Sequence, residues 1–147
     1  MRSQALAGAD GRTFALVFDR GEEVAAGLLH FAREHELRAA SFTAIGALQD
    51  VVLGYWDRRI KDYRRIPIRE QVEVLSLVGN VALAPDGSPR VHAHIVVGKS
   101  DGSAHGGHLL EGHVLPTLEV VLEESPATLQ RKTDPDTGLA LLVLDRS

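Results

Sequence analysis

Histidines crowd one short part of this 147-residue sequence, and the neutral imidazole is the commonest metal ligand in proteins. Five of the seven histidines lie close together: His92, His94, His105, His108 and His113. In the apolar segment 90–97 the side chains of a β-strand would alternate, so His92 and His94 share one face. Their Cα atoms would lie about 7 Å apart, which lets two imidazoles converge on one ion.

A third ligand must come from a neighbouring strand, and Gly106-Gly107-His108 follows after a short connection. We therefore predict His108 as the third ligand, with His105 and His113 as weaker candidates. Three neutral imidazoles leave a tetrahedral zinc ion with one open position, although nickel, copper, iron or manganese also accept imidazole. The alternative is that His92 and His94 simply occupy the solvent face of an antiparallel strand.

Two carboxylates, Glu111 and Glu119, are near these histidines in the sequence. Either is a candidate fourth ligand, hydrogen-bond partner of an imidazole, or general base. The sequence leaves open whether the protein is an enzyme. An enzyme of this kind would carry out metal-assisted hydrolysis or lyase-type proton transfer on a small molecule, and no substrate-recognition motif is visible.

The elements that would position these residues indicate one α+β domain over residues 1–147. Phe14 to Phe18 predicts a first strand, and the apolar spacing from Asp19 to about His35 predicts one amphipathic helix that begins with a capping box of Asp19 and Glu22. From residue 39 onward, short apolar runs separated by turns predict a largely antiparallel sheet. The predicted strands are 39–45, 51–56, 63–68, 72–83, 90–97, 107–112, 117–123, 128–132 and 139–144, and Gly46 predicts a bulge or bend.

The composition excludes several classes of protein. A hydrophobic fraction of 44% and a charged fraction of 24% are typical of a folded domain, and the absence of cysteine excludes disulfides and thiolate metal sites. The longest apolar run, 139–144, is too short to cross a membrane, and the N-terminus lacks the apolar core of a secretion signal. We therefore predict a cytoplasmic protein with no membrane contact.

A basic segment supports a second interpretation. The net charge is −4, which argues against a general affinity for nucleic acid. The segment Arg58 to Arg69 is nevertheless flanked by aromatic residues and could contact DNA. Its candidate nucleic-acid residues are Arg58, Arg59, Lys61, Arg64 and Arg65. The simpler interpretation is a solvated hairpin whose arginines pair with acidic residues.

Several segments together resemble the PPC (plants and prokaryotes conserved) domain family, in the family's order. They are 40–48, 53–56, 72–80, 91–95, 106–112 and 117–121, within a resemblance that runs from about Thr13 to Leu144. The pairing of His-X-His with Gly-Gly-His is the most specific part.

The resemblance implies a single α+β domain that assembles as a homotrimer. It also implies that the histidine-rich metal site of prokaryotic members maps onto His92, His94 and His108. In plant members the domain follows AT-hook motifs that bind DNA, and this sequence contains no such motif. DNA binding is therefore implied only through kinship of fold.

Overall fold

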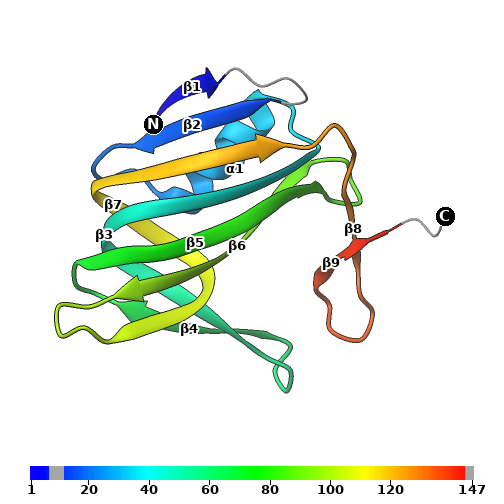
Figure 1. The fold of residues 1–147 in the computed structure, drawn as a ribbon. Helices are drawn as coiled ribbons and strands as arrows, with labels where there is room; N and C mark the ends of the chain where they lie inside the picture. Colours follow the sequence, from blue (N-terminus) through cyan, green and yellow to red (C-terminus); the bar gives the residue numbers. More distant parts are fainter. Residues whose placement is uncertain (7–11, 145–147) are drawn as a thin grey trace.

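The computed structural model describes residues 1–6 and 12–144, which contain nine strands and one helix (Figure 1). In chain order these are β1 (Arg2–Leu6), β2 (Thr13–Phe18), α1 (Val24–Glu34), β3 (Ala39–Asp57), β4 (Asp62–Ile68), β5 (Val72–Leu83), β6 (Pro89–Gly98), β7 (Ala104–Glu124), β8 (Gln130–Thr133) and β9 (Ala140–Val143). The α+β class, the mostly antiparallel sheet and the one amphipathic helix are confirmed. In the described part of the chain, α1 is too short to cross a membrane.

Four strands form a ring of pairings. β3 pairs with β5 and with β7, and β6 pairs with the same two strands. All these pairings are antiparallel, and β2 adds to the other edge of β7. The short hairpin of β8 and β9 stands apart from the main sheet in Figure 1 and joins β5 through the pair Leu83 and Gln130.

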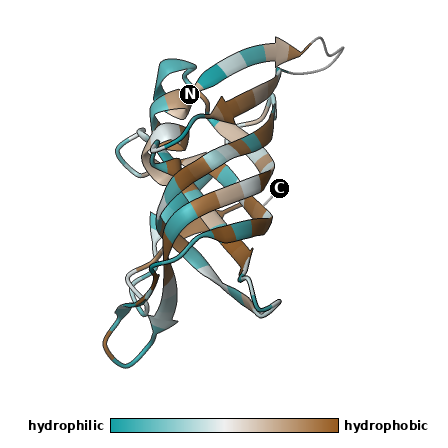
Figure 2. Ribbon diagram, turned by 90° about the vertical axis from the view of Figure 1, so that its left-hand side faces the viewer, coloured by the Kyte–Doolittle hydropathy of each residue, from teal (hydrophilic) through white to brown (hydrophobic). Residues whose placement is uncertain are grey.

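The core lies between α1 and one face of the sheet. Buried positions alternate with half-buried ones along β2 and with exposed ones along the second half of β6, as a strand with one core-facing side requires. Figure 2 shows hydrophilic and hydrophobic residues interspersed along the strands of the sheet. On β6 the buried side chains are Ala93, Ile95 and Val97, and the helix contributes Leu28 and Phe31 to the same core. The face of β6 that carries His92 and His94 therefore points away from the core.

Two strands are longer than the sequence predicts. The predicted strands 39–45 and 51–56 are one continuous strand, β3, and 107–112 and 117–123 are both parts of β7. Gly46 does interrupt the regular pairing between β3 and β5, with a φ of 151°. β1 is absent from the predicted strands because its five residues are all exposed and show no alternating pattern.

The helix begins one turn later than the capping box indicates. Glu22 does accept a hydrogen bond from the backbone N–H of Asp19, but the capping residue is Glu23. The Glu23 carboxylate accepts hydrogen bonds from the backbone N–H groups of Ala25 and Ala26, at 3.1 and 2.5 Å. It also accepts one from Gly112 of β7 at 3.1 Å, so one side chain both caps the helix and ties it to the sheet.

Replacing this cap should measurably destabilise the protein. Glu23→Ala leaves three backbone N–H groups without their acceptor, so we expect the free energy of unfolding to fall by about 1 to 2 kcal/mol. Urea denaturation followed by circular dichroism measures the change. Glu34→Ala, an exposed position near the other end of α1, is the control and should change the value by less than about 0.5 kcal/mol. Equal effects of the two changes would contradict the role of Glu23.

Candidate metal centre

Three imidazoles come together on the outer face of β6 and β7. His92 and His94 lie two residues apart on β6, and His108 of β7 lies directly opposite His94 in the antiparallel register. One nitrogen of each ring lies within 4.8 Å of the other two. The ring centroids are 5.1 to 5.5 Å apart. The structure thus brings together the three residues that the sequence singles out.

Glycines allow the strands around His108 to approach closely. A Cβ atom on Gly107 would lie 2.8 Å from the carbonyl oxygen of Gly54 on β3, so a larger residue there would push the strands apart. Gly54 in turn leaves space for the ring of Tyr63, which would lie 2.8 Å from a Cβ atom at that position. Tyr63 of β4 therefore reaches across β3 and stacks on His108, with centroids 4.6 Å apart.

Burial keeps two of the three histidines in the form that binds metals. His92 and His108 are half-buried, whereas His94 is exposed. Burial, followed by the charges of the neighbouring His92 and His94, lowers the pKa of His108 to about 4. Burial also lowers the pKa of His92, with a smaller contribution from the positive charge of Arg131. Imidazoles with lowered pKa values are neutral at pH 7 and offer a lone pair.

One nitrogen of the cluster lacks any partner in the described part of the chain. His108 Nδ1 is buried and makes no hydrogen bond. A buried polar atom without a partner is costly, so native proteins rarely keep one unless a water, an ion or a ligand satisfies it. Together with the closely spaced neutral rings, this atom fits a bound cation.

A cavity of about 440 Å³ opens beside the histidines. His92 and His108 line it together with residues of the β8–β9 hairpin. Tyr63 and Arg131 also line it, and sequence reasoning did not place either residue at the site. The aromatic character of the segment 55–63 was visible in the sequence, but no pattern linked Arg131 to the histidines.

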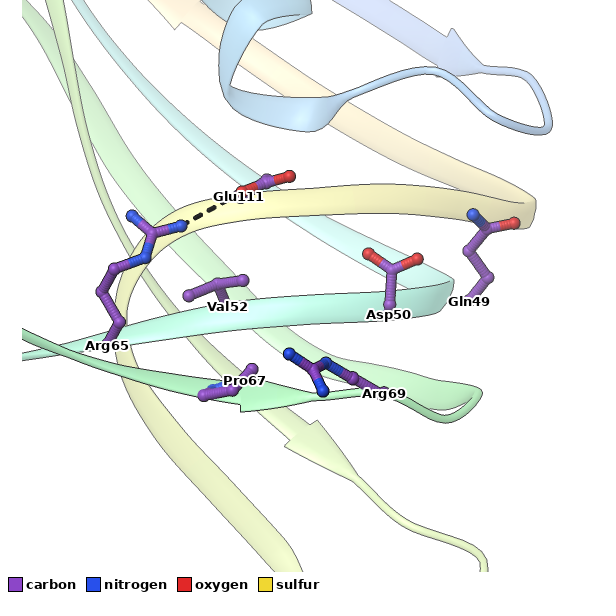
Figure 3. A pocket seen from close by; sticks show the side chains of 7 residues that line it. All are labelled: Gln49, Asp50, Val52, Arg65, Pro67, Arg69 and Glu111. Atoms are coloured by element: carbon purple, nitrogen blue, oxygen red, sulfur yellow. Dashed lines mark hydrogen bonds and ion pairs between the residues drawn. The ribbon is translucent and has the colours of Figure 1, made fainter.

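The two candidate carboxylates lie elsewhere. Glu111 forms an ion pair with Arg65, at 3.2 Å, beside a separate cavity of about 600 Å³ (Figure 3). Glu119 is exposed on the part of β7 that pairs with β2, opposite Val17. Neither belongs to the cluster of three histidines, so the described chain does not bring these carboxylates to the proposed ligands.

The two weaker histidine candidates are also outside the cluster. His105 is exposed and lies opposite Val97. His113 Nδ1 lies 2.7 Å from a carboxylate oxygen of Asp50. This hydrogen bond, together with the negative charge of Asp50, raises the pKa of His113.

Acidic residues neutralise much of the basic segment. Asp57 is buried at the end of β3 and forms ion pairs with both Arg59 and Arg64. Hydrogen bonds from Arg59, followed by the interaction with Arg64, lower the pKa of Asp57. With Arg65 paired to Glu111, three of the five candidate nucleic-acid residues have acidic partners within the chain. Arg58 and Lys61 are the exposed remainder, and no ion pair involves them in the described residues.

A single helix packed on a mostly antiparallel sheet, with three converging imidazoles on the outer face, defines a small α+β domain with a candidate metal site. The family model of the Plants and Prokaryotes Conserved (PCC) domain matches residues 5–126. The chain therefore belongs to the plants and prokaryotes conserved domain family, as the resemblance of its segments predicts.

Similar structures come from bacteria and archaea. A plant- and prokaryote-conserved (PPC) protein from Pyrococcus horikoshii is 33% identical, with a TM-score of 0.85 over 99% of this chain and 97% of its own. A "putative DNA-binding protein" from Bacteroides thetaiotaomicron is 28% identical, with a TM-score of 0.88 over 98% and 99% of the two chains. A metal-containing protein from Archaeoglobus fulgidus is 36% identical, with a TM-score of 0.82 over 92% and 96%.

One curated relative is much longer than this chain. The bifunctional protein GlmU of Synechococcus sp. (strain JA-3-3Ab) is 33% identical over 148 residues. The match includes 99% of this chain but only 22% of that protein. This chain therefore corresponds to about a fifth of the length of that relative.

In metal-free protein the pKa values of His108 and His113 should be shifted in opposite directions. We expect His108 to titrate near pH 4 because of its burial, and His113 to titrate above its ordinary value because of Asp50. Proton NMR of the imidazole signals, assigned with single His→Gln variants, measures both values. Because the pKa of His108 is lower in the folded state than in the unfolded state, protonation favours unfolding. The free energy of unfolding should therefore fall as the pH decreases from about 6.5 toward 4. Titration of His108 near 6.5 would contradict its burial.

Proposed function

We propose that this protein binds a divalent metal ion, zinc, through His92, His94 and His108, and that it does so as a homotrimer. The observation that carries the metal proposal is the convergence of three ring nitrogens within 4.8 Å of one another. The three rings meet only because two strands pair in a specific register, with His94 opposite His108, which is more than a chance grouping of surface histidines needs. The likeness to a metal-containing protein from Archaeoglobus fulgidus, 36% identical over nearly the whole chain, supports the same proposal.

The residues around the site suit such an ion. The lowered pKa values of His92 and His108 keep both rings neutral, and His108 Nδ1 has no other partner within the described chain. An ion held by three imidazoles acts as a Lewis acid on whatever ligand fills its open position. Because Glu111 and Glu119 lie outside the cluster, the proposal is limited to metal and ligand binding and assigns no base.

Association of several chains is supported by the outer face of the sheet. Large apolar side chains are exposed there on neighbouring strands: Ile45, Leu75, Val78, Val96 and Val121. Val78 and Val121 lie on either side of Thr43 in the register, and Val78 is opposite His94. Contiguous apolar patches on a sheet are typical of interfaces between proteins. The number of three chains rests on the resemblance to the family.

Native mass spectrometry tests the ion and the assembly together. We expect a species of three times the 15.9 kDa chain that carries about one divalent ion per chain. In the double variant His92→Ala, His94→Ala the ion should be lost, because one remaining imidazole cannot hold it. Elemental mass spectrometry on the same samples identifies the metal.

His105→Ala is the matched control, since His105 is an exposed histidine of β7 outside the cluster. It should keep the full metal content. Protein that stays free of metal after incubation with zinc, nickel and manganese would overturn the metal proposal. A mass of one chain at micromolar concentration would overturn the trimer and leave the metal proposal standing.

DNA contact through the loop between β3 and β4 is the second candidate function. The observation that favours it is the description of two similar structures, from Bacteroides thetaiotaomicron and Ralstonia eutropha, as "putative DNA-binding" proteins. Among the five candidate residues, the free positive charge for such a contact comes from Arg58 and Lys61, because Asp57 and Glu111 pair with the other three. A trimer would present this pair three times.

This candidate predicts DNA affinity that falls steeply with salt, because each phosphate contact releases a counterion. Fluorescence anisotropy of a labelled duplex between 50 and 200 mM salt, roughly the range over which such contacts weaken, measures the slope. The double variant Arg58→Gln, Lys61→Gln should bind more weakly and show a shallower slope. Arg33→Gln, an exposed change on α1, is the control and should bind as before. Absent or salt-independent binding would exclude this function.

A further inference from the structure

The cavity beside the histidines carries positive charge and no negative charge in the described residues. Its ionisable lining side chains are Tyr63, Arg90, His92, His108 and Arg131. None of the described lining residues is acidic, so an ion at the histidines would add to the positive potential. A cavity of this kind attracts an anionic ligand.

Arg131 is the buried charge of this cavity, with only 6% of its surface exposed. Its Nη1 donates a hydrogen bond to the carbonyl oxygen of Ala140 at 2.8 Å, and its Nη2 donates to Oδ1 of Asn80 at 2.5 Å. Both acceptors are uncharged, and no ion pair involves Arg131 in the described chain. A buried guanidinium without a carboxylate partner is costly to keep unless another anion neutralises it.

One donor of this guanidinium remains free in the described chain. Arg131 Nε is buried and has no hydrogen-bond partner there. Because the proposed ion accounts for His108 Nδ1, Arg131 Nε is the buried polar atom of a cavity-lining residue that still lacks a partner among the described residues, and it points to a further ligand. The donor on Arg131 requires an acceptor, and the charge of Arg131 requires a negative one.

The hydrogen bond to Asn80 also fixes where Arg131 lies. Asn80 of β5 is opposite His92 of β6 in the register, so the guanidinium that it holds lies beside this proposed metal ligand. The charge of Arg131 is close enough to affect the pKa of His92. A group held by Arg131 would thus lie beside His92, one of the three proposed metal ligands.

The other residues that line the cavity determine which chemical group can accompany the anionic group of the ligand. They are largely apolar and come from two regions, the end of β5 with the start of β6 and the β8–β9 hairpin: Ala84, Pro85, Val91, Leu139, Ala140 and Leu141. A volume of about 440 Å³ is at the lower end of the range for small-molecule sites. A small molecule with one oxyanion group and an aliphatic remainder fits these walls.

We propose that Arg131 is a specificity-determining residue that binds the oxyanion group, carboxylate or phosphate, of a small ligand in this cavity. The proposal deepens the proposed function, because it rests on the histidine site as the place where the ligand meets the ion. The β8–β9 hairpin then forms the wall that carries the anion-binding residue. The described cavity gives a cationic ligand no acidic partner.

The test follows the Nε–H signal of Arg131 by proton–nitrogen NMR in zinc-loaded and in metal-free protein. The probes are isovalerate, its uncharged analogue isovaleramide, and inorganic phosphate. We expect isovalerate to shift the Arg131 signal in a saturable manner and isovaleramide to leave it unchanged. A saturable shift with phosphate but not with isovalerate would assign the site to phosphate groups instead of carboxylates.

A variant of Arg131 tests whether its positive charge is needed for anion binding. Arg131→Gln should weaken binding of the effective anion about tenfold or more, because a charge-assisted hydrogen bond is lost. Arg33→Gln is the control, since Arg33 is an exposed arginine of α1 that does not line this cavity, and it should change the affinity by less than about twofold. Measurements on the wild-type signal keep the test valid if Arg131→Gln fails to fold.

The outcomes distinguish this proposal from the proposed function. If the Arg131 signal of zinc-loaded protein shifts with neither isovalerate nor phosphate, the anion site is overturned and the metal site is left intact. Equal binding by wild type and folded Arg131→Gln would overturn it as well. Protein that binds no metal but still shifts its Arg131 signal with an anion would support the anion site while refuting the metal site.

Discussion

The antiparallel register between β6 and β7 is the constraint on which the site depends. His94 and His108 are direct partners in that register, and His92 joins them because it lies two residues from His94 on the same face. A slip by one residue would turn His108 toward the core and replace it with an apolar neighbour. The buried side chains Ala93, Ile95 and Val97 prevent such a slip, because it would expose them to solvent. The packing that stabilises the fold therefore also holds the three proposed metal ligands together.

The sequence predicted the histidine cluster because that cluster depends on local rules. Alternation along a strand has a period of two, which places His92 and His94 on one face regardless of the surrounding fold. A short connection between two strands is sufficient to bring His108 beside them. Glu119 does not follow the same rule, since eleven residues of extended strand separate it from His108 by up to roughly 35 Å. Two residues only eleven positions apart can thus lie far from each other when both belong to one extended strand.

The rest of the site depends on contacts between distant segments, which the sequence pattern does not encode. Tyr63 reaches His108 only because β4 pairs with β3 and Gly54 leaves room for its ring. Arg131 comes from a short hairpin held to β5 by one backbone pair and by its own bond to Asn80. The exposed, short strands β8 and β9 show no hydrophobic alternation that would fix their position. Their placement is visible only in the folded chain.

The two groups of positive charge differ in what surrounds them, and this difference separates the two functions. At the loop between β3 and β4, the buried Asp57 binds Arg59 and Arg64, so the chain itself neutralises much of the basic segment. At the cavity, Arg131 has only uncharged acceptors in the described chain, although it is more deeply buried than either of those arginines. Burial makes an unpaired charge more costly and also makes its interaction with an anion stronger. The buried guanidinium without an acidic partner in the described chain therefore lies beside the histidines, in a cavity with room for a small anion but not for a DNA duplex.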